Sequence, residues 1–334
     1  MDQNKCLIIA EAGVNHNGRL ELALQLCDAA KEAGADVVKF QTWKTERIIT
    51  RSVGQAEYQA INTGKKESQF DMLKRLELTY GDFRRIKEHC DGIGITFAST
   101  ADEEESLDFL VDLGIPFVKI GSGDIGNTPF LRYIGTKKLP TILSTGMSTV
   151  TDVGMSVNAL KEGGAEDITL LHCTTSYPCL LEEVNLRAML TLRDAFRLPI
   201  GYSDHTEGME MAVAAVAMGA KVIEKHFTLD RHMEGPDHAA SMELLEFKKM
   251  VVGIRKVEQG LGDGIKKPTK QECKIKEVVK KRIVALRDIS EGEIFSPENI
   301  CVKRNDAGAG ADEWDSIIRG MAKRGYKKDE GIKL

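Results

Sequence analysis

The chain has 334 residues, of which 42% are hydrophobic and 29% are charged, and its formal net charge is −5. These values are ordinary for a globular enzyme, and the length allows one large domain plus a small one. Because general nucleic-acid binding requires a basic face, the acidic balance excludes that class of partner. An anionic substrate must therefore be held by a few individually placed cations.

The cellular location is indicated by the lack of two kinds of segment. No apolar run reaches the length of a membrane span, and residues 1–6 lack the apolar core of a signal peptide. The seven Cys include no Cys-x-x-Cys pair, which fits free thiols in a reducing compartment better than a disulfide framework. The expected location is the cytoplasm, without membrane attachment.

Short apolar runs rich in β-branched residues alternate with segments of helical period through the first two-thirds of the chain. The eight runs are 6–10, 37–41, 94–99, 117–121, 141–145, 168–173, 199–203 and 222–226. The helical segments include 20–33, 103–113, 152–161 and 209–218. This alternation predicts an α/β fold with a parallel sheet, and eight units are the number that closes a (β/α)8 TIM barrel. A doubly wound open sheet is the competitor, but polar residues follow all eight runs instead of gathering at one switch point.

Two regions depart from this rhythm. Residues 42–91 form a long insertion in which the polar stretch 51–69 is predicted to be a lid or binding loop, followed by a helical segment at 70–90. The barrel is predicted to span residues 1–262, with a closing helix at 243–260. A Gly-, Pro- and Lys-containing linker at 263–281 then leads to a small domain of short strands and turns at 282–334.

His205 and His226 each end a predicted strand and are separated by one strand–helix unit. If neighbouring parallel strands carry them, both imidazoles emerge at the same edge, where a divalent ion could sit between them. The alternative is that both are structural histidines, hydrogen-bonded beside Asp204 or Glu224.

Cations, hydroxyls and glycines gather at the ends of three predicted strands. Lys39 ends the second strand, Lys119 precedes a Gly-Ser-Gly turn, and residues 144–149 read Ser-Thr-Gly-Met-Ser-Thr before a helix. Glycines let backbone N–H groups approach an anion, while hydroxyls and lysines add donors and charge, so these edges resemble a phosphate or carboxylate cradle. Taken singly, a Ser or Thr before a helix is most often a cap.

Other polar residues at strand ends have narrower interpretations. Glu11 is placed to orient a sugar hydroxyl or move a proton, whereas His16 fits a turn-stabilising role in Asn-His-Asn-Gly. His172 is predicted to be a satisfied core histidine. Cys173 has no activating base nearby in the sequence, which argues against a nucleophilic role. Thr175 and Tyr177, beyond the sixth strand, are better placed to line a pocket.

The chain as a whole resembles the sialic acid synthase family, the NeuB-like synthases of N-acetylneuraminate and legionaminic acid. The motifs that carry the resemblance in the first half are Ala-Glu-Ala-Gly-Val-Asn-His-Asn-Gly, Val-Lys-Phe-Gln-Thr, Phe-Ala-Ser-Thr, Val-Lys-Ile-Gly-Ser-Gly-Asp and Leu-Ser-Thr-Gly-Met. Those in the second half are His-Cys-Thr-Thr-Ser-Tyr-Pro, Gly-Tyr-Ser-Asp-His-Thr, Glu-Lys-His-Phe-Thr and Gly-Pro-Asp-His. The tail from Arg282 is similar to the antifreeze-like (SAF, β-clip) domain of that family.

The resemblance implies a metal-dependent transferase that joins phosphoenolpyruvate to an N-acetylated mannosamine-type sugar, giving a nine-carbon 2-keto acid and phosphate. It implies that His205 and His226 bind Mn²⁺ or Mg²⁺. It implies that phosphoenolpyruvate is held by Lys39, Thr100, Lys119, Ser122, Ser144, Thr175 and Ser203. It implies that the sugar is held by Glu11, Gln41, Tyr177, Asp237 and Arg304, with Glu11 also catalytic. Arg304 would reach the sugar from the other subunit of a domain-swapped homodimer.

The sequence departs from the family pattern at two places. The residues after Arg304 read Asn-Asp-Ala-Gly-Ala-Gly where the family commonly has Pro-Gly-x-Gly, and Thr175 stands where neuraminate-forming members often have Asn. The Thr-Thr-x-Tyr-Pro form is similar to members that make legionaminic acid from 2,4-diacetamido-2,4,6-trideoxymannose. The identity of the sugar is therefore left open between this compound and N-acetylmannosamine.

Two other functions compete with this one. A Schiff-base aldolase could use Lys39, Lys119 or Lys225 in the same barrel. Lys225 alternates with Glu224 and His226 along a strand, which predicts that it faces the outer layer or pairs with a helix. A non-catalytic sugar-binding protein is the third reading, and it rests on the tail alone.

Overall fold

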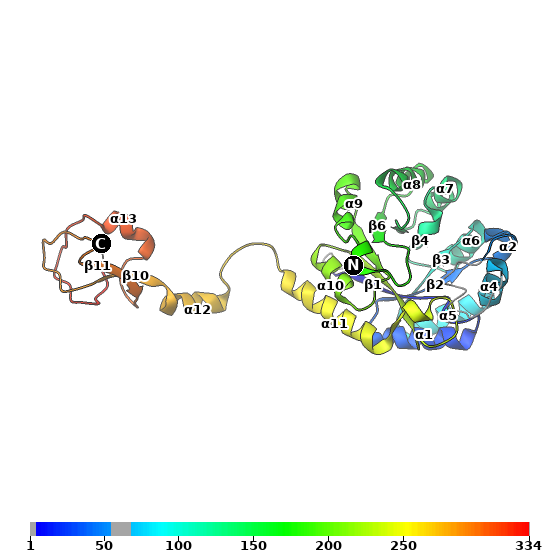
Figure 1. The fold of residues 1–334 in the computed structure, drawn as a ribbon, viewed down its shortest axis with the longest axis horizontal. Coiled ribbons are helices and arrows are strands. Elements are labelled where there is room, and N and C mark those ends of the chain that lie inside the picture. Colours follow the sequence, from blue (N-terminus) through cyan, green and yellow to red (C-terminus); the bar gives the residue numbers. More distant parts are fainter. Residues whose placement is uncertain (1–4, 55–67, 334) are drawn as a thin grey trace. The chain divides into compact units, whose positions relative to one another are not determined.

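The computed structural model of the protein describes residues 5–54 and 68–333 (Figure 1). The chain forms two compact units, Met1–Gly262 and Asp263–Leu334. Each unit has its own apolar core, so each is described by itself. The predicted lid at 51–69 falls for the most part on residues 55–67, which lie outside the described residues.

The first unit is a closed barrel of parallel strands. Strands β1 to β8 pair in chain order, and β1 also pairs with β8, which closes the ring. Their bounds are β1 Leu7–Gly13, β2 Val37–Thr42, β3 Thr96–Ala101, β4 Val118–Ile120, β5 Thr141–Ser144, β6 Ile168–Cys173, β7 Ile200–Asp204 and β8 Val222–Thr228. A two-residue strand, β9 (Met242–Glu243), adds to β8. The barrel prediction is confirmed, and the open-sheet alternative is wrong because an open sheet has no pairing between its first and last strands.

Helices cover the outside of the barrel (Figure 1). They are α1 Leu20–Ala33, α2 Thr45–Ile48, α4 Gln69–Leu76, α5 Tyr80–Ile93, α6 Glu104–Asp112, α7 Thr128–Thr136, α8 Val150–Gly163, α9 Ala188–Phe196, α10 Glu210–Ala217 and α11 Leu244–Leu261. Local sequence sets their ends. In α8, for example, Thr149 and Asp152 form a capping box, and Gly164 adopts the left-handed conformation with φ 109° that closes the last turn.

The predicted single helical segment at 70–90 is two helices, α4 and α5. The break falls at residues 77–79, because Thr79 forms a new capping box with Asp82 and so begins a second helix. Glu77 is also drawn away from the helix, since its carboxylate accepts hydrogen bonds from the backbone and hydroxyl of Thr45. Sequence periodicity alone did not reveal this break.

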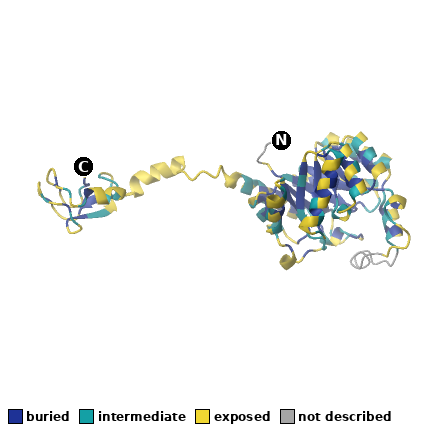
Figure 2. Ribbon diagram, turned by 90° about the horizontal axis from the view of Figure 1, so that it is seen from above, coloured by how far each residue is buried: buried dark blue, intermediate teal, exposed yellow. Residues whose placement is uncertain are grey.

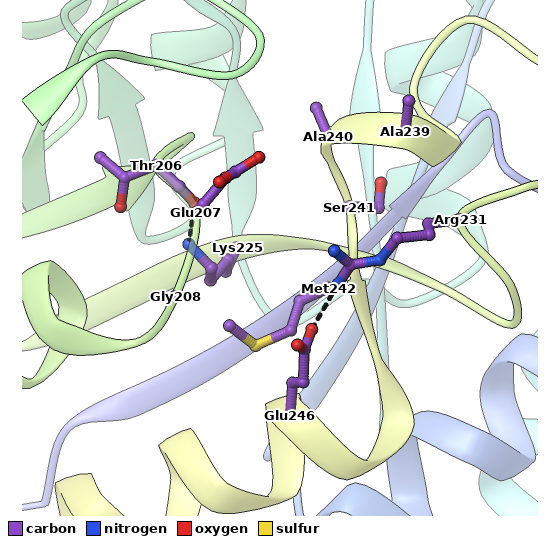
Figure 3. A pocket seen from close by; sticks show the side chains of 10 residues that line it. All are labelled: Thr206, Glu207, Gly208, Lys225, Arg231, Ala239, Ala240, Ser241, Met242 and Glu246. Carbon is purple, nitrogen blue, oxygen red and sulfur yellow. Dashed lines mark hydrogen bonds and ion pairs between the residues drawn. The ribbon is translucent and has the colours of Figure 1, made fainter.

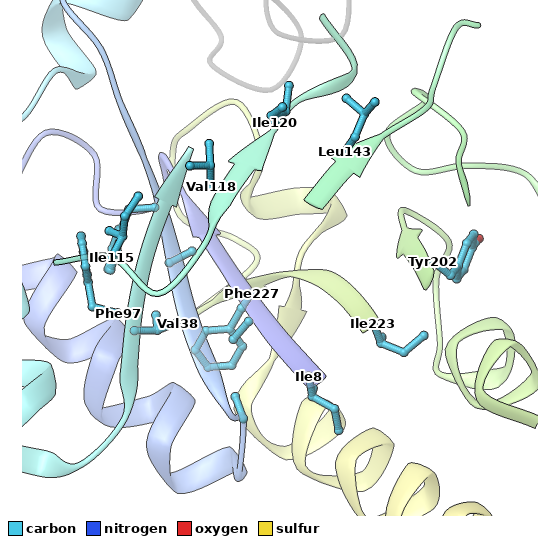
Figure 4. Close-up of a cluster of buried hydrophobic side chains, with 14 of the residues drawn as sticks. Ile8, Val38, Phe97, Ile115, Val118, Ile120, Leu143, Tyr202, Ile223 and Phe227 are labelled. Carbon is cyan, nitrogen blue, oxygen red and sulfur yellow. The ribbon is translucent and has the colours of Figure 1, made fainter. Parts of the chain in front are cut away.

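Two apolar clusters of the first unit lie on opposite faces of the barrel strands. The larger cluster lies between strands and helices, where Ile8, Val38, Phe97, Tyr202 and Ile223 are buried (Figure 4). A smaller cluster, which we call the apolar plug, consists of Ile9, Val37, Ala98, Phe117, Ile142, Leu171 and Val222. Residues of the two clusters are neighbours along the strands, as expected from the alternation of strand side chains between two faces. The strands are accordingly buried along almost their whole length (Figure 2).

The second unit contains a helix and an antiparallel strand pair. Helix α12 (Lys270–Val279) lies within the segment predicted to be a linker, and its residues are exposed (Figure 2). Strand β10 (Lys281–Ala285) pairs with β11 (Ile300–Arg304), and the short helix α13 (Trp314–Ile317) follows. A small apolar cluster that includes Ile283, Phe295 and Tyr326 holds these parts together. Throughout the described parts of both units, no helix combines the length and apolar character that crossing a membrane requires.

Candidate active site

The inward faces of the strands change from apolar to polar toward their carboxyl ends. Because strand side chains alternate, the residue two positions beyond each member of the apolar plug also faces the barrel interior. Those residues, together with the matching position of β7, form a set that we call the polar tier: Glu11, Lys39, Thr100, Lys119, Ser144, Cys173, Ser203 and Glu224. All of them line one cavity of about 190 Å³. The cavity thus lies at the carboxyl ends of the barrel strands, where the active sites of this fold are found.

Four charged side chains of the polar tier alternate in sign. Lys39 Nζ lies 2.6 Å from Glu11 Oε2 and 3.7 Å from Glu224 Oε2, and Lys119 Nζ lies 3.4 Å from Glu224 Oε1. Each of the four is at most 5% exposed. Buried charges persist only when they are paired or hydrogen-bonded, so each lysine here depends on a carboxylate.

The alternation sets the protonation states of these groups. Burial raises the pKa of Glu224, but Lys119 and Lys39 outweigh this and hold it at about 2. Burial dominates for Glu11, whose pKa is raised despite Lys39. Burial also lowers the pKa of Lys119, whereas Glu11 and Glu224 overcome burial at Lys39 and raise its pKa. Glu224 therefore stays ionised, whereas Glu11 takes up a proton more readily.

Each of the two lysines is hydrogen-bonded to a hydroxyl group. Lys39 donates to Thr100 Oγ1 at 2.9 Å, and Lys119 donates to Ser144 Oγ at 2.8 Å. Ser203 donates to Glu224 at 3.1 Å. The Thr175 hydroxyl oxygen is buried without a hydrogen-bond partner among the described residues. It therefore has an unused donor and acceptor facing the cavity.

The turn after β5 brings backbone close to these hydroxyls. Gly146 N donates to Ser122 Oγ at 2.9 Å. A Cβ atom at Gly146 would lie 2.2 Å from Thr175 Oγ1 and 2.9 Å from Ser122 Oγ. Any side chain there would displace both hydroxyls, so glycine lets the turn close against them.

His205 and His226 stand together at the mouth of the cavity. Their ring centroids are 5.3 Å apart, and the ring of Tyr177 lies 4.2 Å from that of His205. His205 Nδ1 lies 2.7 Å from the carbonyl oxygen of Thr174, which can only accept, so Nδ1 carries the proton and Nε2 keeps a free lone pair. The prediction that adjacent strands bring these two imidazoles together is confirmed.

The chemistry of this pair fits a divalent metal ion. Burial, and then the proximity of His205, lowers the pKa of His226 well below its usual value, so its imidazole is neutral and able to act as a ligand. His226 Nδ1 is buried, has no hydrogen-bond partner within the described parts of the chain, and lies 3.9 Å from Asp237 Oδ2. No group of three or more His, Cys, Asp or Glu among residues 5–54 and 68–333 is arranged as a complete metal site. An ion here would therefore take its remaining ligands from water or substrate.

The cavity gathers all the predicted site residues except Asp237 and Arg304. Glu11 accepts a hydrogen bond from Gln41 Nε2 at 3.0 Å, so these two predicted sugar contacts are joined. Asp237 lies beside His226, and burial raises its pKa to about 6. Arg304 belongs to β11 of the second unit and is exposed.

Three cavity residues were missed by the sequence analysis or misjudged. Glu224 and Asp102 line the cavity, and the alternation of strand side chains could have found both, since they lie two residues from His226 and Thr100 respectively. Burial, and then the charge of Asp124, raises the pKa of Asp102 to about 7. Cys173 has a neighbouring imidazole that the sequence did not reveal, because its Sγ lies 3.9 Å from His205 Nδ1, the nitrogen whose proton is donated to Thr174. A contact between adjacent strands cannot be read from local sequence.

Two other histidines, His16 and His172, serve the local structure, as predicted. His16 is fully buried and accepts a hydrogen bond from Gly18 N at 3.0 Å, and burial lowers its pKa to about 4. His172 Nε2 lies 2.7 Å from the carbonyl oxygen of Val184. Neither lines the cavity bounded by the polar tier.

The fold and this cavity place the chain among (β/α)8-barrel enzymes that act on an anionic small molecule. More particularly, the chain belongs to the NeuB family, whose model matches residues 26–266.

Individual relatives agree with this membership. The N,N'-diacetyllegionaminic acid synthase of Campylobacter jejuni is 46% identical over 98% of this chain and 99% of its own length. The protein of that name from Legionella pneumophila is also 46% identical, over 94% of this chain and 89% of its own. The N-acetylneuraminic acid (sialic acid) synthetase of Leptospira borgpetersenii, solved with citrate, superimposes with a TM-score of 0.72 at 34% identity, covering 82% of this chain and 90% of its own.

Proposed function

We propose that the protein condenses phosphoenolpyruvate with an N-acetylated mannosamine-type sugar, giving a nine-carbon 2-keto acid and inorganic phosphate. The observation that carries the proposal is the pairing of two buried lysines with a row of hydroxyls in one cavity, beside two imidazoles. Phosphoenolpyruvate carries a phosphate and a carboxylate, and this cavity offers a separate cation for each. The names of the relatives support the same reaction.

The sugar that we propose is 2,4-diacetamido-2,4,6-trideoxymannose, so that the product is a diacetyllegionaminic acid. Both 46% identical relatives carry the name of that synthase. The Thr-Thr-Ser-Tyr-Pro sequence at 174–178 agrees with this choice. N-acetylmannosamine is the second candidate, and the two differ at carbons 4 and 6 of the sugar.

Lys39 and Lys119 would bind the two anionic groups of phosphoenolpyruvate. The hydroxyls that the lysines now contact, on Thr100 and Ser144, would then donate to the same oxygens, and Ser122, Thr175 and Ser203 would complete the set. Charge-assisted hydrogen bonds are the strong ones in such a site. Glu224 would stay ionised beneath the substrate and keep both lysines protonated.

Glu11, Gln41, Tyr177 and Asp237 would hold the sugar on the opposite side of the cavity. Glu11 would act as the general acid–base group, because burial raises its pKa while Gln41 and Lys39 fix its two oxygens. Its tasks would be to move protons when water adds to carbon 2 of the enol and when phosphate leaves.

The chemistry of the site fits Mn²⁺ or Mg²⁺ held by His205 and His226. The bound ion would supply a Lewis acid for the aldehyde oxygen of the open-chain sugar. The protein's part is to keep the His226 imidazole neutral and both rings close together. Burial lowers the pKa of His205 but its contact with Cys173 outweighs this and raises it, so an ion would have to displace a proton from the His205 ring. Tyr177, packed against both rings, would limit the access of water.

The second unit would act as an antifreeze-like (SAF) domain in a domain-swapped homodimer, with Arg304 reaching the sugar in the partner's barrel. The opposite net charges of the two units support this arrangement. Residues 263–334 contain more Lys and Arg than Asp and Glu, although the whole chain has a net charge of −5. The barrel is therefore more acidic than the chain as a whole, and a basic tail is complementary to it.

The test is phosphate release from phosphoenolpyruvate with three sugars: 2,4-diacetamido-2,4,6-trideoxymannose, N-acetylmannosamine and N-acetylmannosamine 6-phosphate. We expect the first to give the highest kcat/KM, with release abolished by EDTA and restored by Mn²⁺. A higher kcat/KM with either other sugar would overturn the choice of substrate. No release with any sugar in the presence of Mn²⁺ would overturn the reaction. Persistence of activity in EDTA, with trapping by borohydride, would favour a Schiff-base aldolase instead.

A further inference from the structure

Lys225 is a buried cation that the cavity does not use. It is 3% exposed and lies between Glu224 and His226 on β8, so it points away from the barrel interior. The prediction that it faces the outer layer is confirmed, but its partner is a neighbouring strand and not a helix. Its Nζ lies 2.7 Å from Asp204 Oδ2, on β7, and the side chain of Asp204 is fully buried.

The pair is extended by Thr206 into a closed set of contacts, which we call the clasp. Lys225 Nζ also donates to the carbonyl oxygen of Thr206 at 2.7 Å (Figure 3). The second carboxylate oxygen of Asp204, Oδ1, accepts from Thr206 N at 2.9 Å and from Thr206 Oγ1 at 2.7 Å. The one positive and the one negative charge of the clasp are therefore paired with each other, and Thr206 contacts both.

The position of the clasp relative to the two imidazoles is specific. Asp204 and Thr206 flank His205 on both sides, and Lys225 directly precedes His226. Asp204 and Lys225 are also register partners in the parallel pairing of β7 and β8. Since successive side chains alternate, fixing these two residues on the outer face fixes the following residues, His205 and His226, on the inner face.

The clasp also spans the point at which β7 ends. Strand β7 stops at Asp204, so regular pairing with β8 does not hold His205. Beyond that point, the contacts of Lys225 with Asp204 and Thr206 connect this segment to β8. A cavity of about 200 Å³, lined by Thr206, Lys225, Arg231 and Glu246, lies on the outer side, so packing there is incomplete (Figure 3). On the other side the backbone of His205 is held by Cys179, whose N donates to the His205 carbonyl oxygen at 2.8 Å, so the clasp supplies the link to β8.

We infer that Asp204, Thr206 and Lys225 are positioning residues of the metal site, which set the separation and aim of the His205 and His226 imidazoles. The inference rests on the proposed function, because it needs a divalent ion between the two rings. A buried ion pair is a costly way to join two strands and adds little net stability compared with apolar residues. The advantage of the ion pair is that its hydrogen bonds are directional and so permit one relative position of the two strands. Apolar contacts are not directional and permit several positions.

The experiment measures binding of Mn²⁺ alone to the full chain, by the electron paramagnetic resonance signal of free and bound ion, without substrates. Three variants test the clasp: Lys225→Met, the double variant Asp204→Asn with Lys225→Met, and Thr206→Val. The double variant leaves no unpaired buried charge, and Thr206→Val preserves shape while removing one donor, so these two cover the case in which Lys225→Met fails to fold. Thermal melting followed by circular dichroism reports stability in parallel.

The matched control is Arg255→Met. Arg255 forms an ion pair with Asp36, which directly precedes β2 and so lies at the opposite end of the barrel strands. Its loss should lower the melting temperature but leave the Kd for Mn²⁺ unchanged within about threefold. This variant separates loss of stability from loss of positioning.

We expect the Kd for Mn²⁺ to rise by about 10- to 100-fold in the folded clasp variants, with an altered signal from the bound ion, as is typical when the support of metal ligands is removed. Wild-type affinity and an unchanged signal in the double variant and in Thr206→Val would overturn the inference while leaving the proposed metal intact. Failure of the wild-type chain to bind Mn²⁺ would overturn the proposed metal itself, and the inference with it.

Discussion

The Lys39 ammonium lies 2.6 Å from a carboxylate oxygen of Glu11, inside the barrel and shielded from solvent. The pair links two tasks of the proposed reaction, since Lys39 would bind phosphoenolpyruvate and Glu11 would move protons. When an anion binds to Lys39, it competes with Glu11 for the same positive charge. Binding of phosphoenolpyruvate should therefore raise the pKa of Glu11 further and prepare it to carry a proton.

Replacing Glu11 by Gln tests its catalytic role. We expect kcat for phosphate release to fall by about 10²- to 10⁴-fold, because an amide cannot exchange a proton as a carboxyl group does. The Kd for phosphoenolpyruvate, measured by calorimetry, should change little, since Glu224 still pairs with Lys39. Glu21→Gln, on the exposed face of α1, is the matched control and should retain full kcat. Unchanged turnover in Glu11→Gln would refute the assignment.

Removal of both cavity imidazoles should remove the metal. In the His205→Ala, His226→Ala double variant we expect phosphate release to fall by about 10³-fold, because metal-ion catalysis contributes several kcal/mol. The residual rate should no longer respond to EDTA or to added Mn²⁺. His89→Ala is the control, since His89 lies on α5 and pairs with Asp28 on the outside of the barrel. An EDTA-sensitive double variant would place the ion elsewhere.

The raised pKa of Asp102 predicts a pH-dependent effect on stability. Its pKa is about 7 in the folded protein against an ordinary 3.8, so its ionisation opposes folding by an amount that grows between pH 4 and pH 7 and is constant above pH 7. Asp102→Asn should therefore increase the free energy of unfolding by up to about 4 kcal/mol at pH 8. The gain should shrink by about 1.4 kcal/mol for each unit of pH between 7 and 4, because the wild-type carboxyl group becomes protonated on folding.

Urea unfolding of Asp102→Asn at pH 8 and pH 5 measures this difference. Asp112→Asn, at the exposed end of α6, is the control and should show no such pH dependence. A gain that is equal at both pH values would show that the ionisation of Asp102 is not its cause.

The swapped dimer predicts that two impaired variants restore activity to each other when their subunits are mixed. Arg304→Ala should lower kcat/KM for the sugar by about 10- to 100-fold, as expected for a lost hydrogen bond to a charged group. Mixed dimers of Arg304→Ala with Glu11→Gln should regain activity, since one of their two sites combines an intact barrel with an intact Arg304 from the other chain. Unmixed samples serve as the controls. If mixing after subunit exchange restores no activity, Arg304 does not act across subunits.

Truncation tests whether the tail maintains the dimer. If it does, a chain ending near Gly264 should elute as a monomer in size-exclusion chromatography.

The strands and most of the cavity were predictable because one local rule governs both. Alternation along a strand follows from backbone geometry, so Lys39, Lys119 and Ser144 could be assigned to strand ends, and His205 and His226 to one edge, without coordinates. The break between α4 and α5 was missed for two reasons. The capping box of Thr79 and Asp82 is local in sequence but is not visible in helical periodicity, and the hydrogen bond from Thr45 to Glu77 joins residues far apart in sequence. Helical periodicity does not register such a competing contact.

Composition and order of residues were sufficient to establish the kind of barrel, the order of its strands and the residues at their carboxyl ends, because these features follow from neighbours along the chain. The tertiary structure of the barrel alone decided which charged side chains contact one another. Closure pairs β1 with β8 and so places Glu11 opposite His226, and it sets Glu224 between two lysines. The register of β7 and β8 sets Asp204 against Lys225. These contacts join residues from different strands, and their distances depend on how the strands are staggered around the barrel.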